Sequence, residues 1–172
     1  LASGANCKLL VLHNAASRVG AMDVGANNPR GISDLINYDV IFNLGSDEIE
    51  IPNGPFVIYQ GSHGDRGAHR ADIILPAAAY TEESGIFVNT EGRPQMANRS
   101  GFAPGDAREN WAILRALSQK MDVTLNFDTL SQLREALFIE HPHLKNIDLP
   151  LENEWRNEMV GELDKGAFTF AI

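Results

Sequence analysis

Four short apolar runs constrain the fold of this chain more than any other feature. They occupy residues 8–12, 39–44, 56–60 and 72–75, and glycine or proline directly follows the last three. Runs of this length suit strands better than helices. Strands that are apolar on both faces are typical of a parallel sheet covered by other elements. The sequence therefore predicts an α/β fold with a mostly parallel sheet.

The connections between these runs are short. Residues 14–26 carry two glycines and predict a short helix or a loop, and the spacing of Ile32, Leu35 and Ile36 predicts a helical turn that ends near Tyr38. The link from Leu44 to Phe56 is close to the minimum that a parallel crossover needs. We expect this link to be a bare loop, or one of the strands to be antiparallel.

The second half of the chain predicts an irregular segment followed by two helices. Residues 77–104 lack a clear period, apart from a predicted edge strand at 86–89. A D-x-x-E and a T-x-x-Q pattern then predict helix caps. The first helix has its cap at Asp106 with Glu109, and its apolar stripe is Trp111, Leu114, Leu117 and Met121. The second helix has its cap at Thr129 with Gln132, and its apolar stripe is Leu130, Leu133 and Leu137. Pro142 ends the second helix.

These patterns indicate one domain and a tail. We expect residues 1–150 to form the α/β domain and the acidic residues 151–172 to be extended or disordered. The tail ends in an apolar stretch that resembles the start of a further element. Because the first residue is Leu1 rather than methionine, we also expect the chain to be a fragment of a longer protein.

Composition argues against several classes of partner. With 14 basic and 23 acidic residues the chain carries a formal charge of −9, which disfavours nucleic acid and anionic membrane surfaces. Cys7 is the only cysteine, so the chain alone supplies neither a disulfide nor an iron–sulfur or zinc thiolate site. No apolar run has membrane length, and we expect no direct insertion into a membrane.

The loop Gly61–Gly67 directly follows a predicted strand, which allows backbone N–H groups to wrap a phosphate. It matches neither the Walker A pattern nor G-x-G-x-x-G, so a structural or partner-contacting loop is the favoured interpretation. Ser62 beside His63 suggests a serine nucleophile, but the G-x-S-x-G elbow is absent.

Other polar residues form no constellation that specifies a reaction. His141 with His143, and His63 with His69, lack the spacing and the further ligands of a zinc site. The carboxylates close to Arg93 predict a surface ion pair rather than an acid/base pair; these carboxylates are Glu82, Glu83 and Glu91. We therefore assign no catalytic, cofactor-binding or metal residue.

Two longer patterns resemble a known family. Residues 71–95 follow A-D-x-x-L-P-x-x-x-x-x-E-x-x-G-x-x-x-N-x-E-G-R-x-Q, and residues 104–113 follow P-G-x-A-R-x-x-W-x-I. Both resemble signatures of the molybdopterin oxidoreductase family. Residues 59–65, Y-Q-G-S-H-G-D, and residues 43–48, N-L-G-S-D-E, are similar to the branch of that family found in respiratory complex I, in its large iron–sulfur subunit. Residues 80–82 and 115–118 are also similar to that branch.

The resemblance implies a Rossmann-like subdomain of a complex that passes electrons from NADH through FMN and iron–sulfur clusters to quinone. The cluster-binding cysteines of that branch precede this region, and the branch carries no molybdopterin. Catalytic members have N-P where this chain has Asp47 and Glu48, and two carboxylates would repel a pyrophosphate. A structural and interaction role in the peripheral arm is therefore expected.

The implied partners are other subunits of that arm. The implied location is the cytoplasmic face of the bacterial inner membrane or the matrix side of the mitochondrial one, reached through those subunits. Two alternatives stay open: a fragment of a catalytic molybdopterin-dependent oxidoreductase such as formate dehydrogenase, and a stand-alone nucleotide-binding domain that uses the loop Gly61–Gly67.

Overall fold

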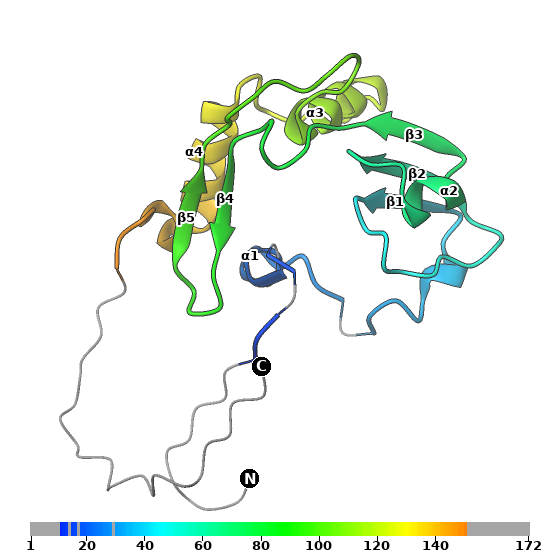
Figure 1. Cartoon of the computed structure of the whole chain (residues 1–172), viewed down its shortest axis with the longest axis horizontal. Coiled ribbons are helices and arrows are strands. Elements are labelled where there is room, and N and C mark those ends of the chain that lie inside the picture. Colours follow the sequence, from blue (N-terminus) through cyan, green and yellow to red (C-terminus); the bar gives the residue numbers. More distant parts are fainter. Residues whose placement is uncertain (1–10, 14, 17, 29, 151–172) are drawn as a thin grey trace, which may run out of the picture.

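A computed structural model of the chain describes residues 11–13, 15–16, 18–28 and 30–150 (Figure 1). The predicted strand at 8–12 and the predicted tail at 151–172 lie outside these residues, except Val11 and Leu12. Those two residues belong to no helix or strand. The chain is α/β, as predicted, with a parallel sheet, an antiparallel hairpin and helices after it.

The parallel sheet contains three of the predicted strands, those at 39–44, 56–60 and 72–75. Its order is β1 (Val40–Leu44), β2 (Phe56–Gly61) and β3 (Ile73–Pro76). Both neighbouring pairs are parallel, with Val40 beside Phe56 and Ile58 beside Ile73. The short link after β1 is a bare loop, which confirms the first of the two expectations for it. Gly45 turns the chain out of β1 at φ +62, in the left-handed region.

One face of this sheet holds the apolar core. Ile41, Val57 and Ile51 are buried together, and Ile51 comes from the link between β1 and β2. The 3-10 helix η1 (Leu35–Asn37) packs Leu35 against them, and the short helix α2 (Arg66–Arg70) contacts β2. The helical turn expected before Tyr38 is therefore present as a 3-10 helix.

The predicted edge strand is half of a separate hairpin. β4 (Gly85–Val88) pairs antiparallel with β5 (Pro94–Ala97) and does not join the parallel sheet. No pattern in the sequence indicated β5. The helix α1 (Arg18–Asp23) packs on β4, where a Cβ added at Gly20 would lie 3.4 Å from Val88 Cγ2. In Figure 1 the hairpin and the sheet stand on either side of an opening, with helix α3 near one end of both.

The two predicted helices are α3 (Asn110–Lys120) and α4 (Leu130–Glu140), followed by the 3-10 helix η2 (Pro142–Lys145). Thr129 caps α4 as predicted, because its hydroxyl accepts from the Gln132 N–H. The predicted Asp106 cap is wrong: α3 begins at Asn110. The predicted burial of both apolar stripes is only partial, since most of their residues are half-buried and Met121 is 64% exposed.

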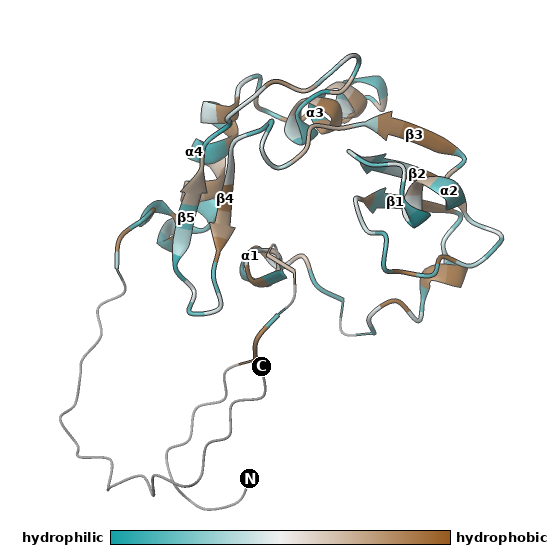
Figure 2. Cartoon of the chain, viewed as in Figure 1, coloured by the Kyte–Doolittle hydropathy of each residue, from teal (hydrophilic) through white to brown (hydrophobic). Residues whose placement is uncertain are grey.

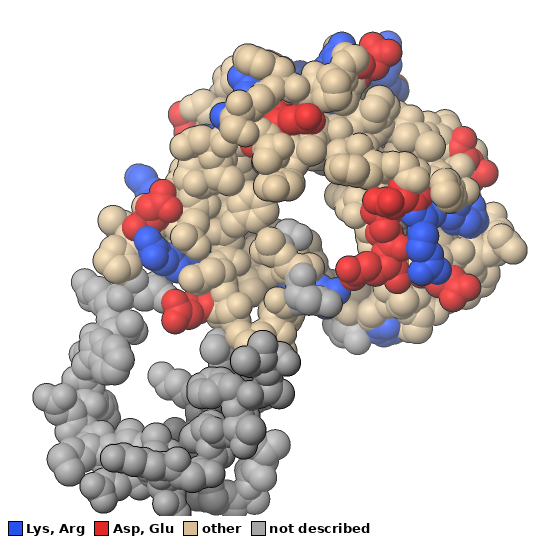
Figure 3. All heavy atoms as spheres, viewed as in Figure 1, with Lys and Arg blue, Asp and Glu red and all other residues tan. Residues whose placement is uncertain are grey.

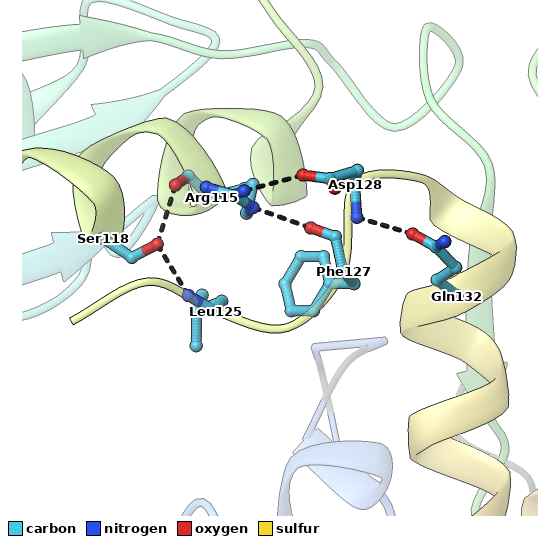
Figure 4. A network of polar contacts seen from close by, with 6 residues as sticks. All are labelled: Arg115, Ser118, Leu125, Phe127, Asp128 and Gln132. Carbon is cyan, nitrogen blue, oxygen red and sulfur yellow. Dashed lines mark hydrogen bonds and ion pairs between the residues drawn. The ribbon is translucent and has the colours of Figure 1, made fainter.

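The link between α3 and α4 is fastened by one arginine (Figure 4). Arg115 Nε donates to the Phe127 carbonyl at 2.8 Å, and its terminal nitrogen lies 2.7 Å from the Asp128 carboxylate. Ser118 Oγ donates to the Arg115 carbonyl and accepts from the Leu125 N–H. The Asp128 N–H then donates to Gln132 Oε1, so the network continues into the first turn of α4. None of the described helices is both long and apolar enough to cross a membrane.

Candidate functional site

An open pocket of about 520 Å³ lies where β1 and β2 end. In open α/β sheets this carboxyl edge is the usual place for a ligand. The pocket also reaches Phe87 of the hairpin and Leu114 of α3, so it lies between the sheet and the elements that follow it. Its polar lining includes the carboxylates of Asp47, Asp65 and Glu83, and no described lysine or arginine lines it.

Asp47 lies at the edge of this pocket and is bound to the glycine loop. Its carboxylate accepts from the Gly67 N–H at 2.9 Å and from the Tyr59 hydroxyl at 3.3 Å. Gly67 is in the first turn of α2. The position at which a phosphate would meet the N–H groups of this loop is therefore taken by a carboxylate of the chain itself.

Tyr59 supports this arrangement from within the sheet, and the residue is only 2% exposed. Burial raises the pKa of the Tyr59 phenol above its ordinary value of 10.0. The negative charge of Asp47, its hydrogen bond to the phenol and the charge of Asp65 raise the pKa further. The phenol therefore stays protonated and acts as a donor to Asp47.

Packing explains why the loop carries glycine at its two ends. A Cβ on Gly67 would stand 2.7 Å from the Ser46 carbonyl oxygen and 2.9 Å from Asn43 Nδ2. A Cβ on Gly61 would stand 2.5 Å from the ring of Tyr59. Gly64, in the middle of the loop, has no such neighbour within 4 Å among the described residues. The outer glycines thus permit close approach between protein segments.

The turn after β1 is fixed by a reciprocal pair of hydrogen bonds. Asn43 Nδ2 donates to the Ser46 carbonyl at 2.8 Å, and Asn43 Oδ1 accepts from the Ser46 N–H at 2.9 Å. Asn43 is only 6% exposed, so both bonds are largely shielded from water. This turn sets the direction in which Asp47 reaches the glycine loop.

Glu83 takes the place that the sequence assigned to Asp106. Its two carboxylate oxygens accept from the backbone N–H of Asn110 at 3.0 Å and from Asn110 Nδ2 at 2.7 Å. The oxygens of Asn110 in turn accept from Gln60 Nε2, which ties β2 to the start of α3. The sequence analysis considered Glu83 only as a carboxylate close to Arg93 and did not single out Gln60. They are 27 and 50 positions from Asn110, so no local pattern could have found them.

The remaining sequence candidates are only partly brought together. Ser62 and His63 line the same pocket, and Ser62 Oγ lies 2.9 Å from His63 Nδ1, but both residues are exposed. His143 approaches Asp23 rather than forming a metal site with His141. Across the described residues no group of three or more histidine, cysteine, aspartate or glutamate side chains could hold a metal ion.

The predicted surface ion pair at Arg93 is wrong. Within the described part of the chain, no ion pair joins Arg93 to a carboxylate. Its guanidinium instead donates to the Asp148 carbonyl at 2.9 Å and so fastens the residue before β5 to the segment after η2. Of the three carboxylates considered, Glu82 accepts from the Ala79 N–H and Glu83 caps α3.

An anionic cofactor does not fit these residues. A dinucleotide carries a pyrophosphate, and three carboxylates with no cation among the described lining residues would repel it. The loop N–H of Gly67 is already bound to Asp47. The site is thus an acidic pocket at the carboxyl edge of a parallel α/β sheet, in a place where this class of protein commonly binds nucleotides.

Comparison with known proteins places the chain within that class. It belongs to the Molybdopterin oxidoreductase family, whose model it matches over residues 2–120. The resemblance noted from its motifs is therefore confirmed.

Curated relatives include subunits of NADH-ubiquinone and NADH-quinone oxidoreductases. The mitochondrial NADH-ubiquinone oxidoreductase 78 kDa subunit of Neurospora crassa is 46% identical to the chain over 142 residues. The NADH-ubiquinone oxidoreductase 75 kDa subunit of Reclinomonas americana is 40% identical over 151 residues. A component of the NADH-quinone oxidoreductase of Rickettsia felis is 42% identical over 147 residues. The first alignment covers 81% of this chain and 19% of the relative, and the other two cover 84% and 22%. The chain therefore spans about a fifth of the length of these relatives.

Proposed function

We propose that the chain is a structural and interaction portion of the peripheral arm of an NADH:quinone oxidoreductase, with no redox centre of its own. The similarity of the chain to subunits of such enzymes in a fungus and a bacterium supports its membership in such a complex. The holoenzyme would carry electrons from NADH through FMN and iron–sulfur clusters to quinone. Those clusters would be held by the part of the parent subunit that precedes this region.

The main support for a role without a cofactor is the hydrogen bond between Asp47 and Gly67. The Asp47 carboxylate accepts from the Gly67 N–H, so an internal anion stands where a phosphate of a bound nucleotide would stand. The charge of Asp65 and Glu83 in the same pocket adds to the repulsion of a second anion. The chain would reach the membrane only through partner subunits, on the cytoplasmic or the matrix side.

An affinity tag on the protein in its native cell tests the assembly. We expect the other subunits of the arm, together with NADH oxidation activity, to purify with the tagged protein. A tagged protein that purifies alone, with no other subunit, contradicts the proposal.

Cofactor content tests the second half of the proposal. We expect the purified 172-residue chain to contain no stoichiometric iron or molybdenum by elemental analysis and no pterin fluorescence after oxidation. Stoichiometric molybdenum and pterin would instead identify a catalytic molybdopterin enzyme. Calorimetry with a nucleotide panel is expected to show no binding, and micromolar binding would identify a nucleotide-binding domain.

A further inference from the structure

The link between β1 and β2 contains the one asparagine of the sequence that a glycine directly follows, Asn53 before Gly54. Both residues are exposed, and in Figure 2 the link bends away from the hairpin on the outer side of the sheet. Among the described residues neither the Asn53 side chain nor the Gly54 N–H makes a hydrogen bond. The fold therefore leaves both groups accessible to water and to each other.

Gly54 meets the steric requirement for an attack on the side chain that precedes it. Its φ is +122, a conformation that residues with a side chain rarely adopt, and a Cβ built on it would have no neighbour within 4 Å among the described residues. With no Cβ, glycine leaves its amide nitrogen unshielded. That nitrogen and the side-chain carbonyl carbon of Asn53 are the two atoms whose bond closes a succinimide ring.

We propose that Asn53 is a site of spontaneous deamidation in this chain. The Gly54 N–H loses its proton to water, and the nitrogen attacks the side-chain carbonyl carbon of Asn53. A C–N bond forms, the bond to Nδ2 breaks, and ammonia leaves with a proton from the solvent. Water then opens the succinimide at either carbonyl, which gives aspartate or isoaspartate and requires no oxidant or reductant.

The backbone of this turn is held at both ends, so isoaspartate would disturb it. Arg70 Nη2 donates to the Pro52 carbonyl at 2.8 Å and to the Pro55 carbonyl at 3.0 Å, on either side of the reacting pair. Ile51, directly before the turn, belongs to the apolar core. Isoaspartate carries the main chain through its side chain and so inserts an extra backbone atom between these fixed points. The hydrogen bonds of Arg70 and the packing of Ile51 then cannot all persist.

Aspartate, the other product, changes only the charge of the turn. Figure 3 shows acidic and basic side chains intermixed over the sheet and α2. Because Asn53 is exposed, one more negative charge there is screened by water. We therefore expect isoaspartate, and not aspartate, to destabilise the fold.

Ageing of the purified 172-residue chain tests the site. Peptide mass spectrometry follows deamidation in mildly alkaline buffer, for the folded chain and for the chain in urea. Asn98 is the internal control, because it is also exposed but precedes Arg99. In the folded chain we expect Asn53 to react at least about tenfold faster than Asn98, and within about tenfold of its own rate in urea. Similar rates at the two asparagines, or stronger protection of Asn53 by folding, overturn the proposal.

Thermal unfolding separates the two products. Isoaspartyl methyltransferase methylates isoaspartate but not aspartate, so it measures the isoaspartate content of the aged chain. The melting temperature of that chain is compared with the melting temperature of freshly purified Asn53→Asp, which has the new charge without the extra backbone atom. We expect the isoaspartate form to melt lower by about 2 °C or more. A smaller difference overturns the effect assigned to isoaspartate. Neither experiment involves another subunit, so both outcomes are independent of the proposed function.

Discussion

The carboxylate of Asp47 accepts a hydrogen bond from the backbone N–H of Gly67 at 2.9 Å, across 20 positions of sequence. The bond joins the loop after β1 to the first turn of α2. It is charge-assisted and part-buried, and such bonds contribute about 1.5–3 kcal/mol to stability. Asp47 is therefore a structural residue of the glycine loop.

Replacing Asp47 with alanine removes the acceptor for both Gly67 and Tyr59. We expect Asp47→Ala to lower the free energy of unfolding by about 1–3 kcal/mol, measured by urea denaturation. Glu48→Ala is the control, because that side chain is 73% exposed and its ion pair with Arg18 is 3.6 Å long. Its effect is expected to stay within about 0.5 kcal/mol. Equal effects of the two changes would contradict the role assigned to Asp47.

The raised pKa of Tyr59 predicts how stability depends on pH. The unfolded chain loses the phenolic proton near the ordinary pKa of 10.0, while the folded chain keeps it to higher pH. Above that pH the unfolded state therefore binds fewer protons, and stability falls as pH rises through the folded pKa. We expect Tyr59→Phe to flatten this decline in urea titrations from about pH 9 to about pH 11. A decline as steep as in the wild type would show that Tyr59 is not its source.

Gly67 is expected to tolerate no side chain. The new Cβ would meet the Ser46 carbonyl at 2.7 Å, and a backbone atom cannot rotate away. We expect Gly67→Ala to cost about 1–3 kcal/mol in the free energy of unfolding, despite the better helix propensity of alanine. Gly64→Ala is the matched control in the same loop, since no described residue lies within 4 Å of its Cβ. It is expected to be neutral or to stabilise by less than about 1 kcal/mol. Wild-type stability of Gly67→Ala would contradict the packing assigned to the loop.

The start of α3 offers a comparison between the cap expected from sequence and the cap observed. Glu83 accepts from the Asn110 N–H, whereas Asp106 is exposed and precedes the helix. We expect Glu83→Ala to lower the melting temperature through a loss of about 1–2 kcal/mol, and Asp106→Ala to leave it nearly unchanged. The reverse order would show that α3 begins in solution where the D-x-x-E pattern put it.

Three of the predicted strands were predictable because apolar runs closed by glycine or proline are local features of the sequence. The cap of α3 was not predictable, because residues before this helix form hydrogen bonds with the end of β3 and the residues after it. The Arg108 N–H donates to the Pro76 carbonyl, and the Arg108 carbonyl accepts from the Ala78 N–H. This bridge holds the backbone out of helical geometry at the place where the pattern predicted the first turn. β5 was missed because its sequence, P-Q-M-A, has no β-branched or aromatic residue and begins with proline.

The candidate site, like the fold, could be predicted only in part from the sequence. The glycine loop and Asp47 were visible in the sequence, and the expectation of repulsion toward a pyrophosphate depended only on charge. The direct hydrogen bond between them was not visible, because it joins two segments that only the parallel sheet brings together. Gln60 was hidden for a further reason: it is a polar residue on an otherwise apolar sheet face, and its hydrogen bonds depend on Asn110 of α3.

Arg115 provides the last prediction, through the two acceptors of its guanidinium in Figure 4. Its bond to the Phe127 carbonyl is part-buried, whereas the Asp128 side chain is 77% exposed and its attraction is screened by water. We therefore expect Asp128→Ala to cost less than about 1 kcal/mol in urea unfolding. Arg115→Ala leaves the Phe127 carbonyl without its donor and is expected to cost about 1–3 kcal/mol. If both variants lost the same free energy, the ion pair rather than the carbonyl bond would fasten α3 to the segment that leads into α4.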